Sequence, residues 1–266
     1  MKIVVCIKQV PDSWAQKRLN SSDSTLDRTN TDAVINDLDE YAIEAALQII
    51  EAQTPGDQAH QVTLLSMGPE RATEAIRKGF SMGADDALHI VDPALAGSDA
   101  LATSLVLAKA VSNAEPDFVL CGTESTDARM AVVPAMLAER LGWPQLTFAG
   151  EMEVDLAARI VRIKRMTDDG VESMEAPMPC VVSVIEKINE PRYPSFKNIM
   201  AAKKKVVQTL TLSELGISSN DVGTAGAWTS VADFAELPPR GAGVKITDDG
   251  TSGDQLVSFL AAKKLV

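Results

Sequence analysis

The sequence contains few of the residues that build metal centres and histidine-based catalytic sites. Its 266 residues include two histidines, His60 and His89, which lie far apart, and three cysteines without a CxxC spacing. We therefore expect neither a metal site nor a histidine-based catalytic triad. The cysteines, Cys6, Cys121 and Cys180, each lie inside an apolar run. That context is typical of reduced, buried thiols in a cytoplasmic protein.

Positive charge and long apolar runs are also scarce. The formal net charge is −12 and the only dense basic run is residues 203–205, so the chain lacks the basic footprint of a nucleic-acid binder. No apolar stretch reaches membrane-spanning length, and residues 1–5 lead into a strand pattern rather than a signal peptide. We expect a cytoplasmic protein that binds no nucleic acid and does not insert directly into a membrane.

The first half of the chain alternates short apolar runs with amphipathic segments. The runs predict strands at residues 3–7, 62–66, 87–91 and 118–121. The segments predict helices that begin at Asn36 or Asp37, span 69–82, run from Ser98 or Asp99 to about 113, and span 130–141. This alternation predicts a parallel sheet with helices on both faces, whose ligands bind beyond the carboxyl ends of the strands.

After Pro144 the pattern changes to antiparallel strands. Residues 151–156, 160–167 and 171–175 are separated by turns and predict a β-hairpin meander, and residues 180–185 are apolar enough to rejoin the main sheet. Residues 189–205 predict a loop followed by a short helix.

The last part of the chain is poor in apolar residues until its end. Residues 216–253 are rich in Gly, Ser, Asp and Thr, and residues 254–265 have the pattern of an amphipathic helix. Either a disordered tail or an arm that packs on a partner fits this composition. We favour the arm, because the apolar helix needs a surface to cover it.

Two segments carry candidate functional residues. The sequence has no P-loop and no complete dinucleotide fingerprint, but the polar loop 122–127 leads from a strand into a helix. Its backbone N–H groups and hydroxyls suit a phosphate, although Ser, Thr and Asp are also ordinary helix-capping residues. The second segment, residues 189–200, contains two prolines and Phe196. Taken alone, Phe196 is either a core side chain or an exposed anchor for a partner.

The meander carries a family signature. Residues 163–172 read IKRMTDDGVE and residues 179–183 read PCVVS, which together resemble the signature of electron-transfer flavoprotein β subunits. Met174 departs from it, because the family usually has Leu, Ile or Val there. NEPRY at residues 189–193 resembles the block that follows the signature. Further matches lie, in order along nearly the whole chain, at residues 7–12, 36–40, 68–69, 82–85, 198–200, 203–205, 238–240 and 242–245.

The resemblance implies an α/β fold of the adenine-nucleotide α-hydrolase-like kind. Its mostly parallel sheet has helices on both faces and is extended by the meander and a C-terminal arm. We expect residues 1–205 to form the nucleotide-binding domain, with the meander and a partner-docking loop. Residues 206–266 are then the arm that packs on the larger α subunit.

The resemblance also implies a function. Family members pair with an α subunit, share an FAD held mostly by α, and bind a structural AMP in β. They accept electrons from dehydrogenases, often acyl-CoA dehydrogenases of fatty acid oxidation, and pass them toward a quinone reductase. The chain is then an electron carrier subunit and not an enzyme in itself, since the redox chemistry belongs to the flavin.

Site residues follow from the matching positions. The resemblance assigns AMP contacts to Cys6, Asn36, Asp37, Leu38, Asp39, Met67, Gly122, Thr123, Glu124, Ser125, Thr126, Asp127, Ala128, Arg129, Met130, Ala131, Val132 and Val133. It places Arg165 near the FAD. It assigns partner docking to Tyr193, Pro194, Ser195, Phe196, Lys197, Ile199 and Met200, with Phe196 at the anchor position that is usually Leu.

Two alternatives stay open at this point. Bifurcating relatives carry a second FAD in place of AMP and usually read Asp-Gly-Asp-Thr-Ala-Gln where this chain reads DARMAVV at residues 127–133. That departure weakens the bifurcating reading and leaves Arg129 to meet a phosphate directly. The other alternative is a stand-alone nucleotide-binding protein of the stress-response type, a homodimer without flavin. The arm and residues 189–205 argue against it.

Overall fold

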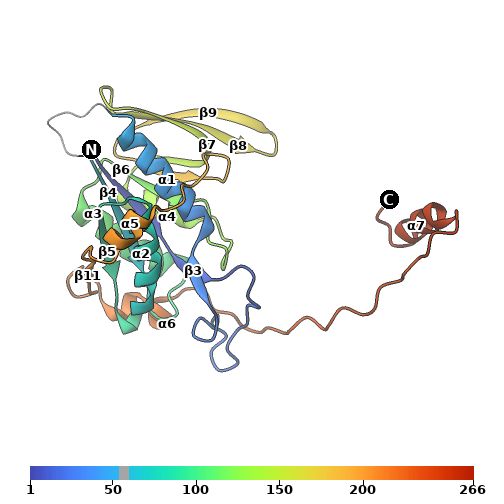
Figure 1. Ribbon diagram of the computed structural model, residues 1–266. Helices are drawn as coiled ribbons and strands as arrows, with labels where there is room; N and C mark the ends of the chain where they lie inside the picture. The colour runs from blue at the N-terminus through green and yellow to red at the C-terminus, as the bar shows by residue number, and fades with distance from the viewer. Residues whose placement is uncertain (54–59) are drawn as a thin grey trace. The chain divides into compact units, whose positions relative to one another are not determined.

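The predicted sheet is present in the computed structural model, which describes residues 1–53 and 60–266. Within the described residues one sheet has nine strands. Their spatial order is β11 (Gln208–Leu210), β5 (Asp86–Ile90), β4 (Gln61–Met67), β1 (Lys2–Ile7), β6 (Phe118–Gly122), β10 (Val181–Val184), β7 (Gln145–Asp155), β8 (Ile160–Thr167) and β9 (Gly170–Pro177). All pairings from β11 to β7 are parallel, and the pairings of β8 are antiparallel. The mostly parallel α/β class is therefore confirmed (Figure 1).

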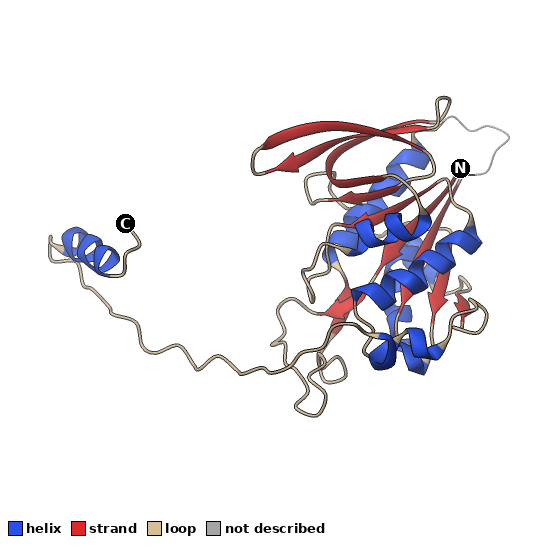
Figure 2. Cartoon of the chain, turned by 180° about the vertical axis from the view of Figure 1, so that it is seen from behind, coloured by secondary structure: helices blue, strands red, loops and turns tan. Residues whose placement is uncertain are grey.

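Helices cover both faces of this sheet, as Figures 1 and 2 show. Successive side chains of a strand point to opposite faces, so β1 contributes to two separate cores. Val5 packs in one core with the residues of α1 (Asp37–Glu51) and α2 (Thr73–Met82). Val4 packs in the other with α3 (Ala100–Ala114) and α4 (Val133–Leu141). β1 is thus buried on both faces, which explains its unbroken apolar sequence.

Local signals fix the start of one helix and the end of another. The Asp99 carboxylate accepts a hydrogen bond from the Ala102 amide at 2.9 Å, so Asp99 is the N-cap of α3. Gly83 ends α2 with φ +137°, a conformation that residues with a Cβ rarely adopt. The expected start of this helix at Pro69 is a separate 3₁₀ turn, η1 (Glu70–Ala72).

The prediction that a helix begins at Met130 is wrong by three residues. Arg129 has φ +49° and Ala131 has φ +54°, and neither value is compatible with a right-handed helix. α4 therefore begins at Val133, with Pro134 in its first turn, where a missing N–H costs nothing.

The meander is present but begins earlier than expected. β7 pairs in parallel with β10 up to Ala149 and antiparallel with β8 from Ala149 to Asp155. Its register with β8 shifts between Ala149 and Glu151, and Phe148 has φ +61°. β7 therefore pairs with β10 along one edge and with β8 along the other, and its backbone is irregular where the two pairings meet. Periodicity alone did not predict this irregularity.

Several short elements were not predicted. The strand β11 extends the sheet beyond residue 205. A two-stranded antiparallel pair joins β2 (Gln9–Pro11) to β3 (Ala33–Ile35). The remaining elements are η2 (Pro93–Leu95), the predicted short helix α5 (Phe196–Ala202), η3 (Ser219–Asp221) and α6 (Gly223–Gly226).

The chain divides into the units Met1–Ala232 and Asp233–Val266, so the division falls after the expected boundary at 205–206. The second unit contains the predicted terminal helix, α7 (Ser252–Ala262). Its apolar side chains Leu256, Val257 and Phe259 are between 44% and 60% exposed. None of the helices in the described part of the chain has both the length and the apolarity needed to cross a bilayer. That residues 206–266 pack on another subunit stays a prediction.

Candidate nucleotide site and docking segment

The predicted polar loop lies where the order of the parallel strands reverses. β1 has β4 on one side and β6 on the other: the chain runs outward from β1 to β4 and β5, and then crosses back to β6 on the opposite side of β1. Cys6 and Cys121 are register partners near the carboxyl ends of these strands. Open α/β sheets bind ligands in the crevice outside such a switch point. The loop that follows β6, residues 122–127, is at this position.

Asn36 ties the start of α1 to this loop. Its side-chain Nδ2 donates to the Glu124 carbonyl at 2.9 Å, and its Oδ1 accepts from the Thr126 amide at 2.9 Å. Nδ2 also donates to the Asp39 carboxylate at 2.9 Å. Asn36 occupies the N-cap position of α1, but its side chain makes no capping bond. The side-chain amide of Asn36 therefore orders the loop 122–127 and does not cap the helix.

Asp39 is a buried carboxyl between β1 and the loop. It accepts hydrogen bonds from the Lys8 amide at 2.7 Å and from Asn36. Burial raises the pKa of Asp39 to about 7, against the opposing effect of these hydrogen bonds. Gly122 lies directly against it, because a Cβ on Gly122 would be 2.6 Å from the Asp39 Oδ1. Only glycine allows this approach.

Asp127 closes the loop through two cations. Its side chain is 1% exposed and accepts from the Lys8 Nζ at 2.8 Å and from the Arg28 guanidinium. Burial alone would raise the pKa of Asp127, but the charge and hydrogen bond of Lys8, together with Ser125 and Arg28, outweigh it and lower this pKa. The Lys8 Nζ also donates to the Ser125 Oγ at 3.2 Å.

The stretch between the loop and α4 has the features of an anion site. Arg129 and Ala131 hold left-handed conformations, which cost free energy in residues with a Cβ. Within the described residues no side chain caps the N-terminus of α4, so its first amides are left for another acceptor. The Arg129 side chain is 71% exposed and lies 3.6 Å from Glu124. The residues present therefore fit a phosphate group.

Three other residues predicted to contact the nucleotide lie near the same end of the sheet. Cys6 and Met67 are half-buried near the carboxyl ends of their strands. Thr123 is buried, and its hydroxyl donates to the Val184 carbonyl at 2.6 Å, so this side chain braces β10. The described residues contain no cluster of three or more His, Cys, Asp or Glu side chains that could hold a metal ion.

Sequence reasoning missed the cations that hold the loop in place. Besides Lys8 and Arg28, Lys17 donates from Nζ to the Thr126 carbonyl at 3.1 Å. Lys8 directly follows the first strand, which was a usable signal. Lys17 and Arg28 lie in the long loop after β2, and their spacing along the chain did not point to this contact.

Arg165 lies at the same end of the sheet but some strands away. Register partners connect Gly122 to Val184, Val184 to Ala149, and Ala149 to Arg165. At the usual strand spacing these three steps cover roughly 14 Å. The Arg165 Nε and Nη2 donate to the carbonyl and hydroxyl of Thr147, both at 3.0 Å. The meander thus holds this guanidinium in place, and its proximity to FAD stays a prediction.

The predicted docking residues are exposed, except Pro194, which is half-buried. Phe196 is 79% exposed and Tyr193 is 97% exposed, so Phe196 does not fill the core of this chain. Ser195 caps the short helix α5 by accepting from the Asn198 amide at 3.2 Å. Ile199 and Met200 are also exposed. Lys197 is exposed beside them, and the loop Tyr-Pro-Ser leads into the helix that presents them.

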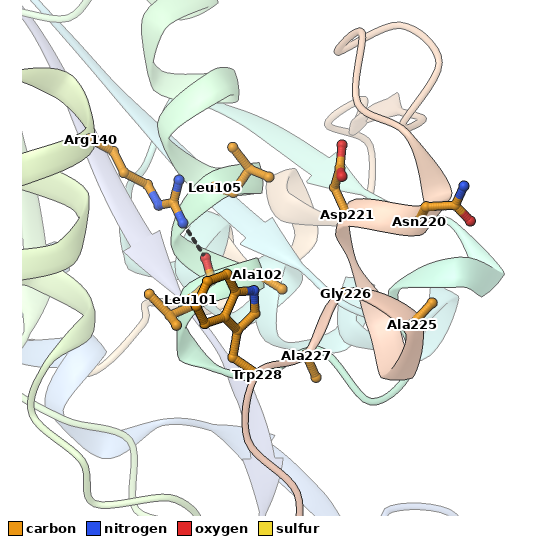
Figure 3. Close-up of a pocket in the computed structure, with 10 residues that line it drawn as sticks. All are labelled: Leu101, Ala102, Leu105, Arg140, Asn220, Asp221, Ala225, Gly226, Ala227 and Trp228. Carbon is orange, nitrogen blue, oxygen red and sulfur yellow. Dashed lines mark hydrogen bonds between the residues drawn. The ribbon is translucent and has the colours of Figure 1, made fainter.

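A pocket of about 320 Å³ lies away from the predicted sites (Figure 3). It is lined by α3, the Arg140 side chain and residues 220–228, and it shares no residue with the predicted nucleotide site. Figure 3 shows Trp228 beside Leu101, whose carbonyl accepts from the Arg140 Nη2 at 2.9 Å. Asp99 accepts from the Trp228 amide at 2.8 Å, which fixes the backbone there.

Comparisons with known proteins agree with this architecture. The model of the electron transfer flavoprotein domain matches residues 23–215. The chain is 49% identical to the electron transfer flavoprotein subunit beta of Mycobacterium tuberculosis and 50% identical to that of Mycobacterium leprae, each over 99% of both chains. It is 32% identical to the caffeyl-CoA reductase-Etf complex subunit CarD of Acetobacterium woodii, over 99% of this chain and 97% of that one. The chain therefore belongs to the electron transfer flavoprotein family, as one of its β subunits.

Proposed function

We propose that this chain, paired with an α subunit, carries electrons on a shared FAD from dehydrogenases toward a quinone reductase. The dehydrogenases are of the acyl-CoA type, which places the heterodimer in fatty acid oxidation. The observation that carries the proposal is the exposed apolar group at residues 193–200, on a chain whose family consists of electron transfer flavoproteins. When bound, FAD supplies the reversible uptake of electrons, and this chain supplies docking and support.

In this proposal the switch-point crevice holds AMP. Supporting residues are Asn36 and Asp39, which order the loop 122–127, and Arg129 with the uncapped start of α4, which suit the phosphate. AMP has a structural role here, because it joins α1, β6 and α4 at one end of the sheet. The free thiols of Cys6, Cys121 and Cys180 support a cytoplasmic location.

Each part of the chain then has its own role in binding or assembly. The sheet and its loops bind the nucleotide, the meander with Arg165 borders the flavin, and residues 206–266 pack on the α subunit. The exposed side chains of α7 support that last assignment, since an apolar helix face is stabilised when a partner covers it. No catalytic residue is assigned to this chain.

The test uses the chain co-expressed with its α subunit. The purified heterodimer is mixed with an acyl-CoA dehydrogenase and an acyl-CoA, and bleaching of the heterodimer's flavin absorbance is followed. The proposal predicts saturable reduction at catalytic amounts of dehydrogenase, followed by reoxidation when a quinone reductase is added. A heterodimer that binds FAD but accepts electrons only from NADH would contradict it and favour the bifurcating alternative.

A further inference from the structure

The docking segment, defined here as residues 189–205, has one buried apolar side chain near its end, Ala202, and little apolar burial before it. Tyr193 and Phe196 are 97% and 79% exposed, and Met200 is 45% exposed. Side chains that remain in water contribute little of the hydrophobic stabilisation that orders most loops. The conformation between residues 193 and 200 therefore depends mainly on the contacts that hold the two ends of the segment.

At the first end, Arg192 is held by two carboxylates of α1. Its Nε and Nη2 donate to the two oxygens of Glu44 at 2.6 and 3.1 Å. Its Nη1 and Nη2 donate to the two oxygens of Glu51 at 2.6 and 2.9 Å. The Arg192 backbone amide also donates to Glu44 at 3.3 Å. Both carboxylates are thus bound in the fork geometry that only a guanidinium offers.

The Glu44 carboxylate is the stronger of these two partners. Glu44 is 4% exposed, whereas the Glu51 side chain is 56% exposed. A charge pair that is shielded from water is stronger than an exposed one, and loss of one partner leaves the other charge unpaired. Asn189 adds a further bond to α1, from its Nδ2 to the Tyr41 carbonyl at 3.0 Å.

At the second end, two cations bind backbone carbonyls. The Arg77 Nη1, on α2, donates to the Ala202 carbonyl at 2.7 Å and to the Lys205 carbonyl. The Lys205 Nζ donates to the carbonyls of Ala84 and Asp85, at 2.6 and 3.0 Å. The segment is therefore fixed on α1 at its start and on α2 at its end, with its apolar side chains left free between.

We propose that Arg192 is a positioning residue for partner docking, which holds the docking segment on α1 so that Tyr193 and Phe196 are presented to the dehydrogenase in their binding conformation. This inference rests on the proposed function, because it assumes that these two side chains contact the dehydrogenase. A segment ordered in advance loses less conformational freedom on binding, so affinity rises without any new contact. Arg192 itself contacts no partner in this account.

The test is a double-mutant cycle in the αβ heterodimer. The variants are Arg192→Gln, the anchor-less pair Tyr193→Ala with Phe196→Ala, and all three together. Flavin reduction by an acyl-CoA dehydrogenase is measured against heterodimer concentration. Arg192→Gln raises the KM for the heterodimer about tenfold at unchanged kcat. This factor corresponds to the conformational entropy of about one additional residue that must be ordered on binding. The anchor-less pair raises KM about thirtyfold, which corresponds to the loss of one hot-spot residue.

The cycle separates this inference from the proposed function. Arg192 acts through the anchors, so adding Arg192→Gln to the anchor-less pair leaves KM where it was. An equal KM increase in both backgrounds overturns the inference, because Arg192 would then contact the partner itself. No effect of Arg192→Gln in the wild-type background also overturns it while the proposed function stands. No effect of the anchor-less pair overturns the inference together with the docking role of Tyr193 and Phe196, whereas a wild-type heterodimer that the dehydrogenase does not reduce overturns the proposed function.

Two further variants control for charge and folding. Arg192→Lys keeps the charge but loses the fork, and still raises KM. Arg162→Gln removes an arginine that lies near three carboxylates on the meander, Glu153, Asp155 and Glu175, and leaves KM unchanged. Tryptic cleavage after Lys197 in the native heterodimer accelerates in both Arg192 variants and not in Arg162→Gln. Unaltered cleavage in the Arg192 variants contradicts a role in ordering the segment.

Discussion

The ammonium group of Lys8 lies 2.8 Å from the carboxylate of Asp127, although 119 residues separate them in the chain. The pair fastens the end of β1 to the loop after β6, on either side of the strand-order switch. Because the Asp127 side chain is 1% exposed, its carboxylate charge is stabilised by Lys8 and Arg28 rather than by water.

Replacement of Asp127 by Asn should destabilise the first unit. Lys8 and Arg28 lose their shared acceptor, and we expect a loss of about 2 kcal/mol in the free energy of unfolding, less than for a fully buried pair because both cations reach solvent. Chemical denaturation of the isolated chain measures this loss. Asp168→Asn, in an exposed turn, is the matched control and should change stability by less than about 0.5 kcal/mol.

The effect of Asp127→Asn should also depend on pH. The folded pKa of Asp127 lies below its ordinary value of 3.8, so its stabilising contribution is present above that value and is lost as the pH falls further. The wild type and Asp127→Asn should differ in stability at pH 7 and converge below pH 3.8. A stability difference that is constant across this range would contradict the ion pairs as its cause.

Asp39 should have the opposite pH dependence. Its folded pKa of about 7 lies above its ordinary value of 3.8, so the folded chain holds this proton more tightly than the unfolded chain. The stabilising contribution is therefore complete below pH 3.8 and falls as the pH rises toward 7. Unfolding free energies of the wild type and Asp39→Asn, measured from pH 4 to pH 8, should diverge with that slope. Parallel curves would contradict the raised pKa.

Substitution of Gly122 by Ala should disturb α1 as well as the loop. The added Cβ would lie 2.6 Å from the Asp39 carboxylate and 2.9 Å from the Leu38 backbone, so the start of the helix must move. We expect a loss of about 2 kcal/mol in unfolding free energy, as for other overpacked sites. Gly241→Ala, where a Cβ meets nothing within 4 Å, is the control. Equal stability of both variants would show that the approach of Gly122 to α1 is not tight.

Removal of residues 233–266 should separate folding from assembly. The first unit keeps both of its cores, so the free chain should unfold at nearly the same temperature as the full-length chain. We expect the truncated chain to lose co-purification with the α subunit, because it lacks the exposed apolar face of α7. Full recovery of the heterodimer by the truncated chain would contradict the arm assignment.

Much of the first unit could be predicted from sequence because its signals are local. The buried run at residues 3–7 and the start of α3 each depend on neighbouring residues. The run was predicted, and Asp99 was one of the two positions, with Ser98, expected to open the helix. The start of α4 was not, because the left-handed Arg129 and Ala131 are neither glycine nor asparagine. The short strand β11 depends on a distant partner, β5, which three residues of sequence do not specify.

In the candidate site, too, the features with local signals were predicted and the long-range contacts were not. The loop 122–127 was found because it follows a buried strand, and Phe196 was found through the family resemblance. The partners that hold them were missed, since Arg28 and Arg192 act on residues 99 and 148 positions away. Long-range ion pairs leave no periodic pattern, so they become visible only when the fold brings their ends together.

In the proposed function this β subunit shares an FAD with an α subunit and binds AMP at its own switch point. The most direct measurement is the nucleotide content of the purified heterodimer, released by denaturation and separated by chromatography. The account predicts one FAD and one AMP for each heterodimer, and loss of the AMP alone in Gly122→Ala. Two FAD molecules without AMP, or a chain that purifies alone without flavin, would contradict it.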